Sequence, residues 1–423
     1  MTTFRSLARN RDFTVLWTGE AISQLGTSVS LFVFPLLGYA LTGSAGLAAL
    51  GEAAYLLGFV ATLLPAGILA DRVHRRRLML LSSATGVAVY AALGALALSG
   101  ALTFTALVLG ALVSGVAAGI FGPAETAALQ AVVPTEDLPT ALSQNQARQH
   151  VASLLGGPLG GVLYTASRAV PFVANAASYL VSCLSLSLLR TDLAAPERVQ
   201  KSRMLADLRE GFGYVWRHPV FRPLLAYAAL SNLVVNAVFT IAILRMVQAG
   251  VAPTAIGLVE TCAGLGGIVG ALMAPRIIDR VATGRITVLA AWSWLPLAAP
   301  LAFTASPWVV GPCVAIGLLL NPAGNAAMGS YRVAVTPAEM IGRTTSAMQF
   351  SAMATMPLAP VLAGLLLHAF GPASSTVGLM ACIAVAALVP TLARAIRTIP
   401  RPASWPTTQP SYNEEPVGAR AAL

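Results

Sequence analysis

Three ionisable residues, Glu20, Glu125 and Arg148, lie inside long apolar stretches of this chain. An ionisable group within a membrane-spanning helix is costly, so by default it marks a proton relay or a substrate pathway. A carboxylate that is partly desolvated beside an arginine can change its protonation state when its surroundings change. The placement of the three residues therefore predicts a site of proton transfer. The alternative interpretation is a static buried ion pair that joins helices.

Amide side chains recur at four-residue spacing in three of the apolar stretches. They are Gln24 (four residues after Glu20), Asn232, Asn236, Asn321 and Asn325. Residues four positions apart share one face of a helix, so each pair presents two polar groups in one direction. These residues predict contacts with a polar part of a ligand, and the alternative is hydrogen bonding between helices.

The composition places these residues in a membrane protein. Hydrophobic residues make up 57% of the 423 positions and charged residues 10%, a balance that would expose large apolar surfaces in water. The net charge of +10 is not gathered in one patch, which argues against a nucleic-acid partner. The four cysteines lie in separate apolar stretches and predict no metal site, and no phosphate-binding loop is present. We expect no enzymatic activity and no cofactor.

Twelve apolar windows have the length of about 20 residues that spans a bilayer. They lie near 13–41, 46–69, 78–99, 102–130, 141–165, 170–190, 223–247, 254–278, 286–305, 308–330, 344–368 and 373–393. The fold class expected is therefore all-α, with twelve transmembrane helices in two six-helix bundles. All but Arg168 and Arg245 of the 26 basic residues then fall on one side, which predicts cytoplasmic termini. The arginine-rich, alanine-rich composition favours a bacterial inner membrane.

The polar interruptions define four predicted regions. These are an N-terminal bundle (1–190), a cytoplasmic linker (191–222), a C-terminal bundle (223–394) and a disordered cytoplasmic tail (395–423). In the linker, Leu205, Leu208, Phe212 and Val215 recur at helical spacing, which predicts an amphipathic helix on the inner leaflet.

An internal duplication relates the two halves. Asp71 and Asp279 are 208 residues apart, and so are Glu52 and Glu260. Parallel repeats of this kind place a transport pathway at the interface of the two halves. Glu52 and Glu260 lie about 28 Å along their helices from the aspartates. They are secondary candidates for the pathway, or solvated carboxylates near the outer surface.

A charged segment at 67–77 lies where one predicted span ends and the next begins, and a weaker copy follows in the second half. The residues expected to act in gating are Gly67, Asp71, Arg72, Arg75, Arg76, Asp279 and Arg280. An aspartate at a helix end can accept hydrogen bonds from a neighbouring helix N-terminus and pair with arginine, which holds one conformational state. The alternative is a loop that only sets topology and faces lipid headgroups.

The sequences RNRDF at 9–13 and GILADR at 67–72, within a six-plus-six arrangement, resemble the major facilitator superfamily over residues 9–395. The likeness is to its exporter branch, which contains enterobactin and macrolide efflux proteins. It implies that the first, fourth, seventh and tenth spans line a central cavity, with Glu20 and Glu125 in it and Arg148 beside them.

The resemblance implies a secondary active transporter that works by alternating access. We expect a monomeric, proton-coupled exporter of a small amphipathic compound, with membrane lipid, protons and that small molecule as its partners. An importer or symporter and a lipid flippase share the architecture and stay open. A non-transporting membrane sensor is the remaining alternative.

Overall fold

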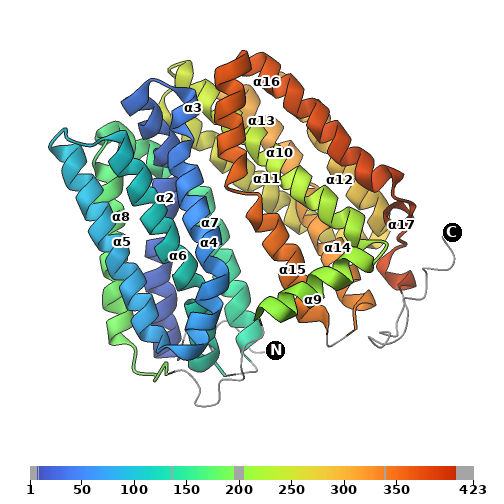
Figure 1. Ribbon diagram of the computed structural model, residues 1–423, viewed down its shortest axis with the longest axis horizontal. Helices are drawn as coiled ribbons and strands as arrows, with labels where there is room; N and C mark the ends of the chain where they lie inside the picture. Colours follow the sequence, from blue (N-terminus) through green and yellow to red (C-terminus); the bar gives the residue numbers. More distant parts are fainter. Residues whose placement is uncertain (1–6, 8, 135–136, 195–203, 338–339, 406–423) are drawn as a thin grey trace. The chain divides into compact units, whose positions relative to one another are not determined.

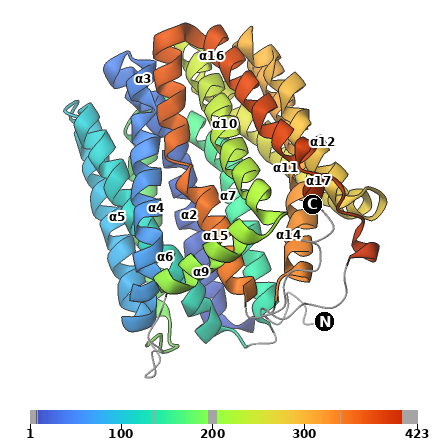
Figure 2. The same cartoon turned by 45° about the vertical axis from the view of Figure 1, so that its right-hand side comes forward.

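The computed structural model describes residues 7, 9–134, 137–194, 204–337 and 340–405, which form helices and no strand. Figures 1 and 2 show the helices from two directions. Their bounds are α2 Arg11–Thr42, α3 Ala45–Ala48, α4 Leu50–Arg72, α5 Arg75–Leu98, α6 Phe104–Val132, α7 Leu138–Ala166, α8 Val170–Leu188, α9 Met204–Arg217, α10 Phe221–Gln248, α11 Pro253–Arg280, α12 Thr283–Ala298, η1 Pro300–Ala302, α13 Pro307–Leu318, α14 Asn321–Val335, α15 Ile341–Ala354, α16 Leu358–Leu392, α17 Arg394–Arg397 and η3 Pro402–Ser404.

Ten helical stretches of the described chain are long and apolar enough to cross a membrane. The last of them, Ile341–Leu392, contains two of the twelve predicted spans, separated at a kink where Gly371 has a φ of 73°. The remaining predicted span is α7, which is less apolar because its first half carries the polar run 143–150. Each of the twelve predicted spans therefore lies on helix.

Four predicted spans are interrupted where continuous helices were expected: Ala49 separates α3 from α4, Ala299 separates α12 from η1, and two longer breaks divide the spans at 308–330 and 344–368. The longer breaks fall at 319–320, between α13 and α14, and at 355–357, between α15 and α16. Pro322 and Pro357 lie at these breaks. Proline lacks the amide hydrogen that a helix interior requires and disfavours helical backbone in the residue before it.

Contacts divide the chain into two compact units. Unit 1 comprises residues 1–202 and 243–261, and unit 2 comprises residues 203–242 and 262–423. In unit 1, α2 packs against α7 and α8, α4 packs along α6, and α5 packs against α6 and α8. The blue to green helices of Figure 1 show this packing. The predicted domain boundaries at 190, 222 and 394 stay predictions.

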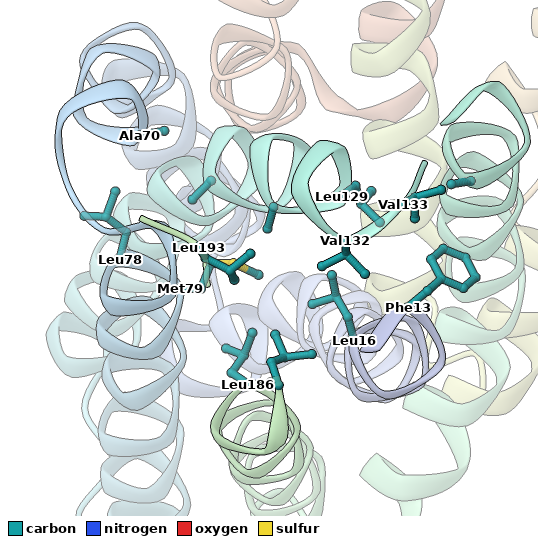
Figure 3. Packing of buried hydrophobic residues seen from close by; sticks show 14 of the residues in the cluster. Phe13, Leu16, Ala70, Leu78, Met79, Leu129, Val132, Val133, Leu186 and Leu193 are labelled. Carbon is teal, nitrogen blue, oxygen red and sulfur yellow. The ribbon is translucent and has the colours of Figure 1, made fainter. Parts of the chain in front are cut away.

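Buried hydrophobic side chains form a cluster at one end of unit 1. Figure 3 shows Phe13 and Leu16 from α2 pointing toward side chains of α6, with Met79 from α5 and Leu186 from α8 beside them. Leu16, Met79 and Leu186 are fully buried. Burying side chains of this size stabilises a soluble protein by about 1.5–3 kcal/mol each, but within a membrane close packing supplies most of the gain.

Glycine lets α4 and α6 approach each other closely. A Cβ added at Gly115 would lie 2.0 Å from the Tyr55 carbonyl oxygen, and one at Gly58 would lie 2.4 Å from the Leu112 carbonyl oxygen. No real side chain fits at such distances, so these two positions require glycine. Small residues at helix contacts are how membrane helices gain van der Waals packing.

The amphipathic linker helix packs on protein, where the sequence predicted a lipid surface. Its observed form is α9, and Val215 is fully buried in a unit 2 cluster, with Leu208 and Phe212 packed against that cluster. Arg343 of α15 donates a hydrogen bond to Glu210 of α9 at 2.9 Å. An amphipathic pattern shows that a helix needs an apolar surface, but does not say whether lipid or protein supplies it.

The start of the predicted disordered tail is ordered by contacts with unit 2. Ile396 and Ile399 are buried, and the Thr283 amide donates to the Pro400 carbonyl at 3.3 Å. Two apolar residues three positions apart lie on one face of a short helical turn, and that face can be buried. The proline-rich composition of the tail makes this pattern hard to recognise in the sequence. Residues 406–423 of the predicted tail lie outside the described residues.

His218 is buried where α9 meets α10. Its ring stacks on Phe221 with a centroid distance of 3.9 Å, and its Nδ1 accepts a hydrogen bond from the Val220 amide at 3.3 Å. Burial disfavours the charged imidazolium and lowers the pKa of His218 from 6.5 to about 4.

We predict that unit 2 loses stability as the pH falls from 6.5 toward 4. In this window the unfolded chain binds a proton at His218 that the folded chain does not bind, so acid favours unfolding. The measurement is the thermal unfolding midpoint of detergent-purified protein at pH 7 and pH 5. His218→Phe should reduce the difference between the two midpoints, whereas His368→Phe, at an exposed histidine, serves as the matched control. An unchanged pH dependence in His218→Phe would contradict the assignment.

Candidate functional site

Glu20, Glu125 and Arg148 come together inside unit 1. Arg148 of α7 donates from Nη2 to Glu125 Oε1 of α6 at 2.7 Å, and these side chains are 4% and 7% exposed. Glu20 of α2 is buried too, and both Glu125 and Arg148 lie within electrostatic reach of it. The site therefore holds two carboxylates and one guanidinium in a buried setting.

The hydrogen-bond partner of Glu20 is a hydroxyl. Ser182 of α8 donates from Oγ to Glu20 Oε1 at 2.6 Å, and the Ser83 hydroxyl of α5 lies 2.9 Å from Ser182 Oγ. The sequence analysis missed both serines. The available signal was the spacing of Asn175, Ser178, Ser182 and Ser185, which puts polar groups on one face of an otherwise apolar helix.

The predicted amide residues divide between the units. Gln24 of α2 is half-buried in unit 1, whereas the four asparagines lie in unit 2 and are exposed. Asn236 donates from Nδ2 to the Asn232 carbonyl at 2.7 Å on α10, and Asn325 donates to Asn321 Oδ1 on α14. The expected shared face of each asparagine pair is thus observed.

Two of the predicted gating arginines are engaged within unit 1. Arg76 donates from Nη2 to the carbonyls of Leu189 and Thr191, the latter at 3.2 Å. The Arg75 amide donates to the Leu193 carbonyl at 3.1 Å. These contacts fasten the segment that follows α8 to the start of α5.

The other predicted gating residues lie at the ends of α4 and α11. Arg72, Asp279 and Arg280 are exposed, and Gly67 is half-buried. The Asp71 backbone belongs to α4, and its side chain lies outside what the structure describes.

Asp12 is a structural residue that the sequence analysis did not single out. Its Oδ2 accepts hydrogen bonds from the Arg190 amide at 3.0 Å, the Thr191 amide at 2.7 Å and the Thr191 hydroxyl at 2.6 Å. Asp12 lies in the first turn of α2, where Asn10 caps the helix by accepting from the Phe13 amide. A lone carboxylate at the start of the first span was the available signal.

The repeat-related carboxylates Glu52 and Glu260 both belong to unit 1 and lie within electrostatic reach of each other. Glu52 lies in the first turn of α4. Glu260 lies against α7, where a Cβ at Gly157 would be 2.4 Å from Glu260 Oε2. Each is half-buried, which differs from the fully solvated alternative.

The family model described as Major Facilitator Superfamily matches residues 16–354. The chain belongs to this superfamily. It is 28% identical over 362 residues to a protein named multidrug efflux pump Tap from Mycolicibacterium fortuitum, covering 82% of this chain and 87% of that protein. A protein of the same name from Mycobacterium tuberculosis H37Rv is 27% identical over 384 residues, covering 87% of this chain and 89% of that protein.

Solved structures show the same fold at low sequence identity. A bacterial homologue of the iron transporter ferroportin, in an inward-facing state, has a TM-score of 0.70 and 16% identity, covering 93% of this chain and 99% of that one. The nucleoside transporter NupG has a TM-score of 0.67 and 13% identity, covering 90% and 100%. The predictions of superfamily, all-α fold and non-enzymatic transporter are confirmed. The chain is a multi-pass membrane protein that handles a small molecule.

We predict that Asp12→Ala lowers the free energy of unfolding by about 4–5 kcal/mol, because each hydrogen bond to a charged group is worth about 1.5–3 kcal/mol and three are lost. Asp192→Ala is the matched control: its side chain is 81% exposed, lies 3.2 Å from His74 Nε2 and accepts a hydrogen bond from the Ala194 amide at 3.0 Å. An exposed pair contributes less than about 1 kcal/mol. Urea unfolding in detergent, followed by tryptophan fluorescence, gives both values. Equal losses in the two variants would contradict the role of Asp12.

Proposed function

We propose that this chain is a proton-coupled exporter of small amphipathic compounds in the bacterial inner membrane, acting as a monomer with both termini in the cytoplasm. The relatives named multidrug efflux pump support a drug-like substrate and outward transport. The distribution of basic residues supports the orientation. The two expected six-helix bundles are the parts that would move in alternating access.

The buried charge imbalance at Glu20, Glu125 and Arg148 carries the proposal of proton coupling. Arg148 neutralises Glu125 through a bond of 2.7 Å, and the second carboxylate, Glu20, has a hydroxyl as its partner. A buried carboxylate without a bonded counter-charge favours its protonated form. Glu20 is therefore our proton carrier, and the Glu125–Arg148 pair is the fixed charge that senses its state.

The exposed asparagines of unit 2 support a hydrated substrate path. Asn232 and Asn236 on α10, and Asn321 and Asn325 on α14, present polar groups from spans that are otherwise apolar. Polar groups within a span face the bundle interior or a water-filled cavity, because lipid offers them no partner. These residues, with Gln24, are our proposed substrate contacts.

We assign the gate mainly to charged residues that are exposed at the ends of α4 and α11. Because Arg76 and the Arg75 backbone already hold the segment after α8, we assign the gate to the exposed Arg72, Asp279 and Arg280, together with Asp71 and the half-buried Gly67. The arginines at 75 and 76 then keep the gate anchored to unit 1.

We predict that Glu20→Gln lowers pH-driven ethidium transport by about 100-fold or more, the usual weight of a proton-transferring group, while ethidium still binds. The assay uses proteoliposomes that contain the pH-sensitive dye pyranine, with ethidium as the probe. Ethidium should move out of the compartment that corresponds to the cytoplasm as protons enter it.

Glu125→Gln should destabilise the protein itself, unlike Glu20→Gln, which should affect transport alone. It leaves the Arg148 guanidinium buried without its counter-ion, which costs about 3–5 kcal/mol, so the protein should be unstable in detergent. Asp192→Asn, at an exposed carboxylate, should transport like the wild type. Full pH-driven transport by Glu20→Gln would reject our site. Ethidium and protons moving in the same direction would indicate a symporter instead.

A further inference from the structure

A column of buried polar residues runs along one face of α8. Asn175, Ser178, Ser182 and Ser185 are 0–8% exposed. Their spacing of three or four residues places them on one side of the helix, toward α2 and α5. Buried polar residues are expensive in a membrane protein, so four on one face call for a physical explanation.

The inner level of this column contains Glu20. Its carboxylate accepts from Ser182 at 2.6 Å, and Ser182 shares a 2.9 Å hydrogen bond with Ser83 of α5. Ser83 and Ser182 are fully buried. The hydroxyl pair therefore connects Glu20 of α2 through α8 to α5 in the buried interior of unit 1.

Two further levels follow toward the opposite end of α8. The Thr27 hydroxyl and the Tyr179 hydroxyl lie 3.0 Å apart, and Asn175 donates to Ser30 Oγ at 2.7 Å. Ser178 donates to Asn175 Oδ1 at 2.9 Å. On α2, Thr27 lies seven residues, or about 10 Å, beyond Glu20, so more than one water molecule, each with two to four polar partners, is needed to bridge these two levels.

Glycines on the neighbouring helices leave room for the polar side chains of the column. A Cβ at Gly26 of α2 would lie 2.3 Å from both Asn175 Oδ1 and Ser178 Oγ, and one at Gly86 of α5 would lie 2.7 Å from the Tyr179 ring. The polar side chains thus occupy the volume that a larger residue would fill. The ring of Tyr90 of α5 flanks the column and stacks on Tyr179 with a centroid distance of 5.7 Å and on Phe172 with one of 6.3 Å.

We propose that this seam, formed by Ser83, Ser182, Thr27 and Tyr179 with bridging water, is the route by which Glu20 exchanges its proton, separate from the substrate path. In the final step the Ser182 O–H bond breaks as a Glu20 Oε1–H bond forms, and Ser182 takes a proton from Ser83. Ser83 takes its replacement proton from a protonated water, which is left as neutral water, and the reverse sequence releases the proton. Asn175 orients the hydroxyls and transfers no proton.

Four other ionisable groups lie around Glu20. Glu125 of α6, Arg148 of α7, and Tyr179 and Cys183 of α8 lie within its electrostatic reach. Glu125 and Arg148 neutralise each other, so they set the field at Glu20. Of the four groups, Tyr179 alone belongs to the seam.

The test measures hydrogen–deuterium exchange of the Glu20 carboxyl by infrared spectroscopy on the full chain in liposomes, without substrate. Loss of the band in Glu20→Gln assigns it. Ser182→Ala and Ser83→Ala should slow the exchange about tenfold, the effect of losing one hydrogen bond of about 1.4 kcal/mol. Ser182→Thr keeps the hydroxyl and should restore the rate.

Ser185→Ala is the matched control, because Ser185 is on the same face of α8 and donates to its own helix at Val181. Gel filtration checks the folding of each variant, and Ser83→Ala leaves the Glu20–Ser182 bond in place if Ser182→Ala does not fold. Exchange in both alanine variants as fast as in Ser185→Ala would overturn the route.

The inference rests on the proposed role of Glu20 as proton carrier, and the two can fail separately. If the wild-type protein shows no carboxyl band that Glu20→Gln removes, the proton carrier is wrong. If the band is present but its exchange does not depend on Ser83 and Ser182, the carrier stands and the seam is only a set of bonds that join helices.

Discussion

The cost of holding charge in an apolar interior governs the arrangement of this protein. The sequence supplies few charged residues, and two carboxylates buried in unit 1 have different partners. Arg148 is paired with Glu125 at short range, whereas Glu20 rests on a serine hydroxyl. Two carboxylates around one guanidinium cannot both be neutralised by it, so a proton is the natural third component. This imbalance is the observation on which our proposal of proton coupling rests.

Polar backbone groups at the ends of helices also need partners in an apolar interior. The last carbonyls of α8 have no partner within the helix, and the chain must turn toward the linker at that point. Arg76 satisfies the Leu189 and Thr191 carbonyls, while Asp12 binds the amides of Arg190 and Thr191. An arginine from the predicted topological segment and an aspartate from the first turn of α2 thus supply hydrogen-bond partners for open backbone groups of unit 1.

Close packing explains how polar groups can be buried in unit 1. Where two helices meet through glycine, as at Gly58 and Gly115, backbone meets backbone and no polar side chain is needed. Where glycine of one helix faces serine or asparagine of the other, as at Gly26, hydroxyl and amide groups fill the gap and bond across it. Small residues therefore permit two kinds of contact, backbone against backbone and hydrogen-bonded polar side chains.

The sequence by itself determined the membrane class, the twelve spans, the repeat and the candidate carboxylates, because hydropathy and charge placement follow directly from the cost of moving each residue into lipid. It also indicated the linker helix. Only the tertiary structure decided which neighbour each polar group meets: that Arg148 takes Glu125, that Ser182 takes Glu20, and that α9 covers a protein cluster. Those pairings depend on the rotation and separation of helices distant in the chain, which periodicity along one helix does not encode.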